Sequence, residues 1–224
     1  MLTAAILAGG RATRFGGRDK SALVVDRRDG RTIFERQMSE LTQIAGEILW
    51  VGATMPSRRP GPGPAVTQVA DLIAGCGPLG GLHAALTAAR GDVVIAIACD
   101  MPYVSAPFLA YLASLMGEPG QPVGPGGIGG PGGPGGSGGF DAVVPQTEHG
   151  YHPLCAAYAR AMIAPIERRL AARRLTMMDL LADVRLRVVT QEEIGRFGDP
   201  HQLLANVNTP AEHQSLEALH NHEV

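Results

Sequence analysis

The chain has 224 residues, 45% of them hydrophobic, which is enough to bury one sizeable core and too short to favour two full domains. A formal net charge of -2 excludes the broad positive surface that binding to nucleic acid or to an anionic membrane requires. The three cysteines are odd in number and widely spaced, so neither a disulfide framework nor a thiolate zinc site is expected. The apolar run Ala4–Ala8 is too short for a signal peptide, and no later stretch reaches membrane-spanning length. We therefore expect a single cytoplasmic domain over residues 1–224.

Short runs rich in apolar and β-branched residues recur along the chain and predict strands. They are Thr3–Ala8, Glu47–Gly52, Val66–Ala70, Asp92–Ala98 and Phe140–Pro145. Helical patterns lie between most of them; after the first run, apolar residues recur at helical spacing as Phe34, Met38, Leu41 and Ala45. Strands that alternate with helices form a largely parallel sheet, which predicts an α/β fold.

Composition changes abruptly in the segment 117–139, where glycine and proline predominate and glycine falls at every third position from Gly124 to Gly139. The triplets are too few to sustain a triple helix, and the segment lacks apolar mass to pack. We interpret 117–139 as a disordered insertion within the domain. A second, shorter Pro/Gly-rich loop covers Pro56–Pro64, and neither segment is expected to carry chemistry.

The segment Leu7–Lys20, LAGGRATRFGGRDK, carries the strongest functional signal. Its first glycines, Gly9 and Gly10, follow an apolar strand, and ligands of open α/β sheets bind at that end of the strands. Glycines let backbone N–H groups approach phosphate oxygens, while basic side chains supply charge; these are Arg11, Arg14, Arg18 and Lys20. The spacing is not that of a Walker A loop. The segment predicts a triphosphate-binding loop, with a flexible basic loop as the alternative.

Gly75–Gly81 formally satisfies the dinucleotide-binding pattern GxGxxG, but it is separated from the preceding strand and contains a proline. We interpret it as a turn that opens a helix over Leu79–Arg90.

Asp100 follows the most apolar strand of the chain, in the sequence CDMP. Mg²⁺ prefers oxygen ligands and often takes only one or two carboxylates, so Asp100 is a candidate magnesium ligand. On this motif alone, a turn-capping role before Pro102 is equally well supported.

Histidines give weaker signals. His152 precedes Pro153 and is compatible with either a pocket polar group or a turn residue. His220 and His222 lie near the end of the chain, where a frayed tail is a better interpretation than a metal site.

Taken together and in chain order, five motifs resemble the molybdenum cofactor guanylyltransferase family. They are Leu7–Lys20, GPLGG at 77–81, CDMP at 99–102, HPLCAAY at 152–158 and NVNTP at 206–210. The resemblance covers nearly the whole chain and implies a Rossmann-like, three-layer domain of the nucleotide-diphospho-sugar-transferase type. Three features depart from the family pattern: Phe15 replaces the usual methionine, GPLGG replaces GPLAG, and the segment 117–139 is foreign to the family.

The same resemblance implies roles for individual residues. It assigns nucleotide binding to Leu7, Ala8, Gly9, Gly10, Lys20, Asp71 and Asp100. It assigns metal binding, and with it a catalytic role, to Asp100. Lys20 and Arg14 would add positive charge near the β- and γ-phosphates of the nucleotide, which makes them our candidates for catalytic basic residues. Asn206 or Asn208 would contact the substrate phosphate or help to hold the metal.

The implied reaction transfers GMP from GTP to the phosphate of molybdopterin, with Mg²⁺ as cofactor and pyrophosphate as leaving group. Molybdoenzyme apoproteins and other cofactor-biosynthesis proteins are candidate partners, with no nucleic acid or membrane. Gly10 and the GPL turn at 77–79 favour guanine over a cytidylyltransferase that acts on the same pterin, whose relatives carry LAAG and lack GPL. A non-catalytic nucleotide-binding module is a further alternative, and Asp100 and Lys20 argue against it.

Overall fold

The computed structural model describes residues 1–8, 20–25, 30–52, 55–56, 64–70, 73, 75–117 and 139–207. Within these ranges an eight-stranded sheet has the order β3-β2-β1-β4-β7-β5-β6, and β8 pairs with β5. The strands are β1 (Leu2–Ala8), β2 (Glu47–Gly52), β3 (Val66–Val69), β4 (Val93–Ala98), β5 (Ala142–Thr147), β6 (Gly150–Tyr151), β7 (Cys155–Ala159) and β8 (Leu186–Val189). All five predicted strands are present, each within two residues of its predicted bounds, and β6, β7 and β8 were not predicted.

The sheet is mostly parallel, as predicted. β1 pairs in parallel with β2 and β4, β2 with β3, and β5 with β8. β7 is antiparallel to both β4 and β5, so these two run in the same direction. The last residues of β1, β2, β4, β5 and β8 therefore point to one edge of the sheet, which we call the carboxyl edge.

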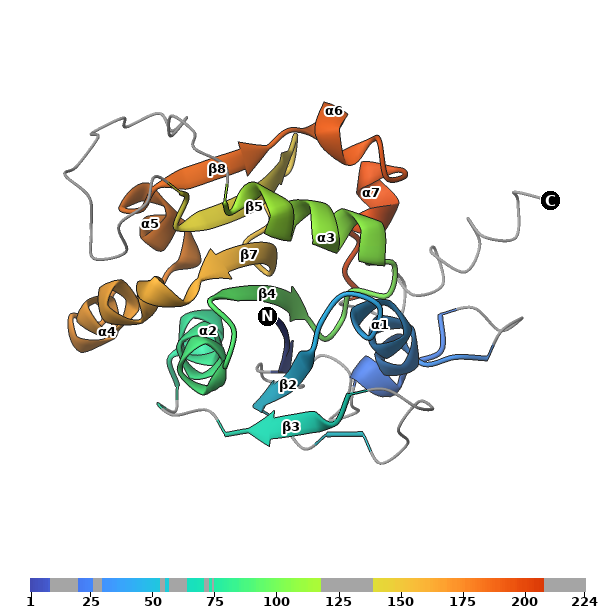
Figure 1. Ribbon diagram of the computed structural model, residues 1–224, viewed down its shortest axis with the longest axis horizontal. Coiled ribbons are helices and arrows are strands. Elements are labelled where there is room, and N and C mark those ends of the chain that lie inside the picture. Colours follow the sequence, from blue (N-terminus) through green and yellow to red (C-terminus); the bar gives the residue numbers. More distant parts are fainter. Residues whose placement is uncertain are drawn as a thin grey trace.

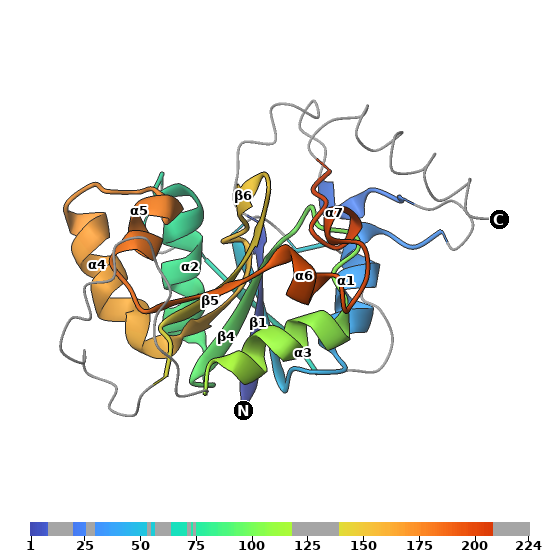
Figure 2. The ribbon, with the colours of Figure 1, turned by 90° about the horizontal axis from the view of Figure 1, so that it is seen from above.

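Helices cover both faces of the sheet, which confirms the predicted three-layer arrangement (Figures 1 and 2). One face carries α1 (Ile33–Leu41), α3 (Ala106–Leu115), α6 (Gln191–Ile194) and α7 (Pro200–Leu203), and the other carries α2 (Gly77–Ala88), α4 (Ile163–Ala171) and α5 (Met177–Ala182). Two short 3₁₀ helices, η2 (Lys20–Ala22) and η3 (Arg160–Met162), complete the described elements. Each face has its own cluster of buried apolar side chains, so the sheet separates two cores.

α1 forms where the sequence predicts it. Thr32 and Glu35 make a reciprocal capping box, which satisfies backbone N–H groups that the first turn leaves unpaired. Phe34 then packs edge-on against Trp50 of β2, with ring centroids 5.3 Å apart. Ala45 lies beyond the end of the helix but is still buried, so the predicted apolar face is correct although the helix is shorter.

α2 begins at Gly77, two residues before the predicted start, so the GPL sequence forms its first turn rather than a turn ahead of it. Gly75 and Gly77 have φ of +79° and +59°, a left-handed conformation that favours glycine. Pro78 fits the first turn because its missing N–H would have no partner there. A Cβ on Gly81 would lie 3.8 Å from the side chain of Leu7, an ordinary van der Waals contact, so α2 packs against β1 at a distance that would also accommodate alanine.

Cys76, Cys99 and Cys155 are free thiols, as expected. Within the described ranges, no helix is long and apolar enough to cross a membrane. Residues 118–138, which make up nearly all of the predicted insertion, lie outside the described part of the chain.

Candidate active site

Asp100 is half-buried in the turn that follows β4 at the carboxyl edge. The N–H of Cys99 donates to the carbonyl of Leu7 at 3.2 Å, so this turn lies directly beside the end of β1. Leu7 is buried and Ala8 half-buried there. The ends of two parallel neighbours therefore bring Leu7, Ala8 and Asp100 together, where open α/β sheets bind ligands.

Gln37 holds the Asp100 turn from the side of α1. Its buried side-chain amide donates to the carbonyls of Ala98, at 2.8 Å, and Met101, at 3.0 Å, on either side of Asp100. This residue was not identified from the sequence. The sequence feature that could have identified it is a polar residue at position 37 on the same helical face as the apolar Phe34 and Leu41.

The 206–210 motif begins next to Asp100. The N–H of Val207 donates to the carbonyl of Asp100 at 2.9 Å. Val207 is itself buried with Val25 and Ile33, which anchors this segment to the start of α1. The neighbouring Asn206 is exposed. Two motifs that are more than a hundred residues apart thus meet at the carboxyl edge.

Lys20 begins η2, next to the buried Ser21. The segment that follows packs against the start of α1, since the N–H of Ile33 donates to Leu23 at 2.8 Å and Val24 bridges Thr32. The Lys20 side chain lies outside the described part of the structure, as do several other predicted site residues. These are Gly9, Gly10, Arg14, Asp71 and Asn208.

Positive charge lies near the Asp100 turn. A pocket of about 200 Å³ opens beside residues 102–105 and includes the side chains of Arg31, Arg36 and Glu40. The Arg36 guanidinium lies 5.9 Å from the centre of the Tyr103 ring, and Glu40 accepts a hydrogen bond from the N–H of Ala106 at 2.8 Å. The lining of this pocket therefore carries two positively charged residues and one carboxylate.

His152 forms part of a turn, which decides between the two interpretations of this residue. Its Nε2 lies 2.9 Å from the hydroxyl of Thr147, and its N–H donates to the carbonyl of Pro145. Burial, and then the charge of His149, lower the pKa of His152, which favours the neutral imidazole near pH 7. The rest of the HPLCAAY motif builds β7, whose buried Tyr158 donates to the carbonyl of Pro153 at 2.6 Å. This motif therefore shapes the sheet between β4 and β5.

Comparison with solved structures defines the class of protein. The fold matches that of molybdopterin-guanine dinucleotide biosynthesis protein A from Archaeoglobus fulgidus, with a TM-score of 0.72, 21% identity and 98% of each chain covered. It also matches 2-C-methyl-D-erythritol 4-phosphate cytidylyltransferase from Thermus thermophilus, with a TM-score of 0.58, 16% identity, and 99% of this chain and 100% of the other covered. The architecture is therefore the nucleotide-diphospho-sugar-transferase fold.

Sequence comparison then identifies the family. Residues 4–189 match the MobA-like NTP transferase domain. A relative from Pelotomaculum thermopropionicum, a probable molybdenum cofactor guanylyltransferase, is 32% identical over 212 residues, which cover 94% of this chain and 89% of the relative. The chain belongs to the MobA-like NTP transferase family and is a nucleotidyltransferase.

Proposed function

We propose that this nucleotidyltransferase transfers GMP from GTP to the terminal phosphate of molybdopterin and releases pyrophosphate. The name of its Pelotomaculum relative supports the choice of substrates. The observation that carries the chemistry is the pair of backbone hydrogen bonds at the Asp100 turn, from Cys99 to Leu7 and from Val207 to Asp100. Through them, Asp100 lies beside the end of β1, which leads into the glycine-rich sequence, and beside the segment that carries Asn206.

The donor set at this edge fits Mg²⁺. Asp100 offers a half-exposed carboxylate on a turn whose backbone is fixed, with the exposed amide of Asn206 on the segment bonded to that turn. Among the described residues, Asp100 belongs to no group of three histidine, cysteine or acidic ligands. Such a sparse set suits Mg²⁺, which keeps several waters and binds substrate phosphates. When bound by Asp100, Mg²⁺ would neutralise negative charge on the phosphate oxygens.

The chain's own residues would act mainly by positioning and electrostatics. The backbone from Leu7 to Gly10 would receive the phosphates of GTP, and Asp71 would contact the nucleotide. An oxygen of the molybdopterin phosphate forms a bond to the α-phosphorus in line with the bond to the leaving pyrophosphate, which breaks. A phosphate monoester is already largely ionised near pH 7, so no strong base is required. Lys20 and Arg14 would stabilise the charge on pyrophosphate, and Asn206 or Asn208 would hold the acceptor phosphate.

A pyrophosphate-release assay tests this proposal. Release should require GTP, Mg²⁺ and molybdopterin together, and mass spectrometry should detect the dinucleotide product. Release with CTP in place of GTP, at an equal or higher rate, would reassign the enzyme as a cytidylyltransferase. Nucleotide binding without release under any combination would identify a non-catalytic module.

Base selectivity provides a second test. A site built to hydrogen-bond guanine leaves polar groups unpaired when another base enters, at a cost of about 1–3 kcal/mol for each buried group. We expect kcat/KM for GTP to exceed that for CTP and ATP by about 5- to 150-fold in direct competition. Equal values for GTP and ATP would contradict a guanine-specific site.

We also propose a cytoplasmic location, which agrees with the three free thiols because disulfides are rare in a reducing compartment.

Molybdoenzyme apoproteins, or other proteins of cofactor biosynthesis, would then receive the product. A pull-down with tagged protein, with and without product, tests this transfer.

A further inference from the structure

Three side chains with metal-binding chemistry meet at the carboxyl edge, outside the Asp100 turn. Glu148 and His149 form the turn between β5 and β6, and His201 belongs to α7. Figure 2 shows that β6 and α7 both lie at the end of the sheet opposite to the amino terminus. The three residues therefore come from two elements more than fifty residues apart in the sequence.

The ligand atoms of these residues are close together. The Glu148 carboxylate lies 3.1 Å from Nε2 of His201 and 3.8 Å from Nε2 of His149. All three ligand atoms lie within 4.8 Å of one another, and the two imidazole ring centroids are 5.8 Å apart. In the part of the chain that the structure describes, this is the one group of three or more such ligands.

The backbone holds both elements in place without any ion. The N–H of His149 donates to the Thr147 hydroxyl at 3.3 Å, and Gly150 closes the turn at a φ of +107°. The N–H of His201 donates to the side chain of Asp199 at 3.0 Å, which caps α7. A ligand that joins the two elements would have to order three exposed side chains but no additional backbone, so the backbone entropy cost of binding is small.

We propose that Glu148, His149 and His201 form a site for a divalent transition metal of the Zn²⁺ type. Two imidazole nitrogens and one carboxylate oxygen are a ligand set that zinc accepts and that magnesium does not favour. Tetrahedral zinc with bonds of about 2.0–2.2 Å places its ligand atoms about 3.3–3.6 Å apart. The observed separations bracket that range, so small side-chain rotations complete the site. The remaining coordination positions face solvent.

Such a metal would clamp the β5–β6 turn to α7. α7 leads directly to Asn206 and Val207, and the latter holds the carbonyl of Asp100. Metal binding would therefore stiffen the segment that borders the candidate active site. The proposal concerns metal binding alone, so it stands or fails independently of the nucleotide and acceptor assigned above.

Calorimetric titration of the chelator-treated full chain with ZnCl₂, in excess MgCl₂, tests the site. Wild type should bind one equivalent, and His149→Ala and His201→Ala should each weaken Zn²⁺ binding at least about tenfold. Glu148→Gln should also weaken it, whereas Glu192→Gln, an exposed carboxylate on α6, should not. Zn²⁺ should raise the Tm of wild type and of Glu192→Gln but not of His201→Ala.

Histidines near the end of the chain provide the critical control. A His220→Ala/His222→Ala double variant should bind Zn²⁺ as wild type does. Loss of binding in this variant, with binding retained in His149→Ala and His201→Ala, overturns the proposal. Absence of a Zn²⁺-dependent heat or Tm change in folded wild type overturns it as well.

Discussion

The carbonyl of Asp100 accepts a hydrogen bond from the N–H of Val207, and this backbone bond does not depend on the chemistry of the side chain. Asp100→Asn keeps the size of the side chain and removes the charge that would hold Mg²⁺. We expect kcat/KM to fall by at least about 100-fold, while the protein still unfolds in one cooperative transition. Steady-state pyrophosphate release and urea unfolding measure the two effects.

Asp92→Asn is the matched control, because Asp92 is exposed at the opposite end of the same strand. The kcat/KM of Asp92→Asn should equal that of wild type. Near-normal, Mg²⁺-dependent turnover in Asp100→Asn would refute the assignment of Asp100 as the metal ligand.

Gln37 acts on the site indirectly, through the two carbonyls that it binds. Gln37→Leu leaves buried carbonyl groups without this donor, and we expect it to lower the free energy of unfolding by about 1–3 kcal/mol. Because the turn that carries Asp100 would loosen, the Mg²⁺ concentration for half-maximal activity should rise. Gln43→Leu, which removes an exposed amide that lies just beyond α1 and donates to the carbonyl of Ser39, should change neither quantity. An unchanged Mg²⁺ requirement in Gln37→Leu would leave Gln37 with a purely structural role.

The sequence predicts the positions of some residues of the site but not of others. Leu7 lies near the end of one apolar strand and Asp100 follows its neighbour, so parallel pairing alone places them together. Gln37 contacts a carbonyl 61 residues away, and the cluster of Glu148, His149 and His201 joins a turn to a distant helix. Such contacts depend on the angle and register of packed elements, which no local pattern in the sequence specifies.

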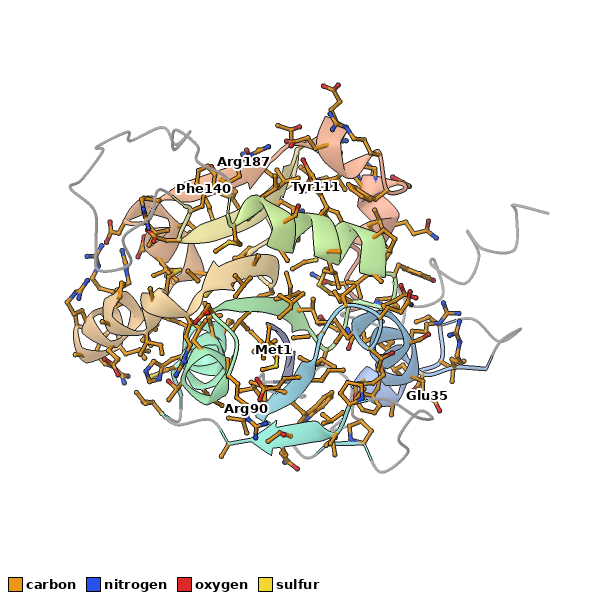
Figure 3. All side chains as sticks on the ribbon, viewed as in Figure 1. Met1, Glu35, Arg90, Tyr111, Phe140 and Arg187 are labelled. Atoms are coloured by element: carbon orange, nitrogen blue, oxygen red, sulfur yellow. The ribbon has the colours of Figure 1, made fainter. Side chains whose placement is uncertain are left out.

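At the scale of elements, an ion pair and its hydrogen bonds tie α3, β8 and α6 together. Arg187 of β8 and Tyr111 of α3, both labelled in Figure 3, donate to the carboxylate of Glu193 in α6. Burial alone would raise the pKa of Glu193, but hydrogen bonds from Arg187, Thr190 and Tyr111 outweigh it and lower that pKa to about 2. Burial, and then the bond to Glu193, raise the pKa of Tyr111.

This network predicts a dependence of stability on pH. The pKa of Glu193 is lowered from 4.5 to about 2 in the folded chain, so its ionised form stabilises the fold above about pH 4.5. That contribution is lost as the pH falls from about 4.5 towards 2. Glu193→Gln should cost roughly 1–3 kcal/mol at pH 7, with a smaller difference from wild type near pH 3. Urea unfolding of wild type and Glu193→Gln between pH 3 and pH 7 measures this difference in the free energy of unfolding. A constant difference at all pH values, or an equal loss in the exposed neighbour Glu192→Gln, would contradict this explanation.

The strands that the sequence failed to predict lack a local strand pattern, for two different reasons. β7 is the short, alanine-rich sequence CAAYA, which lacks the β-branched residues that mark a strand. It is a strand because β4 and β5 pair with it on both sides and its small side chains are buried between two helical layers. β6 and β8 have only two and four residues, too few to give a periodic pattern.

At the scale of the whole molecule, segment 117–139 interrupts the chain between α3 and β5. We predict that replacing it with a short flexible linker preserves pyrophosphate release and changes the free energy of unfolding by less than about 1 kcal/mol, because loop length has a small effect on closure entropy. The flanking Met116 and Phe140 must be kept, since both are buried in the core beneath α3. Loss of soluble, folded protein in the deletion variant that retains Met116 and Phe140 would mean that the segment has a structural role.

The position of β7 in the sheet also sets an order of assembly during synthesis on the ribosome. β1 to β4 are contiguous in the sheet and complete by residue 98, but β5 and β8 join them only through β7, which ends about 60 residues later. At a synthesis rate of about 5–20 residues per second, the edge of β4 that later pairs with β7 therefore has no partner strand for roughly 3–12 s. An open apolar edge invites pairing with other chains. Much of the chain made during that interval is segment 117–139, which is too rich in glycine and proline to compete for the edge as a strand.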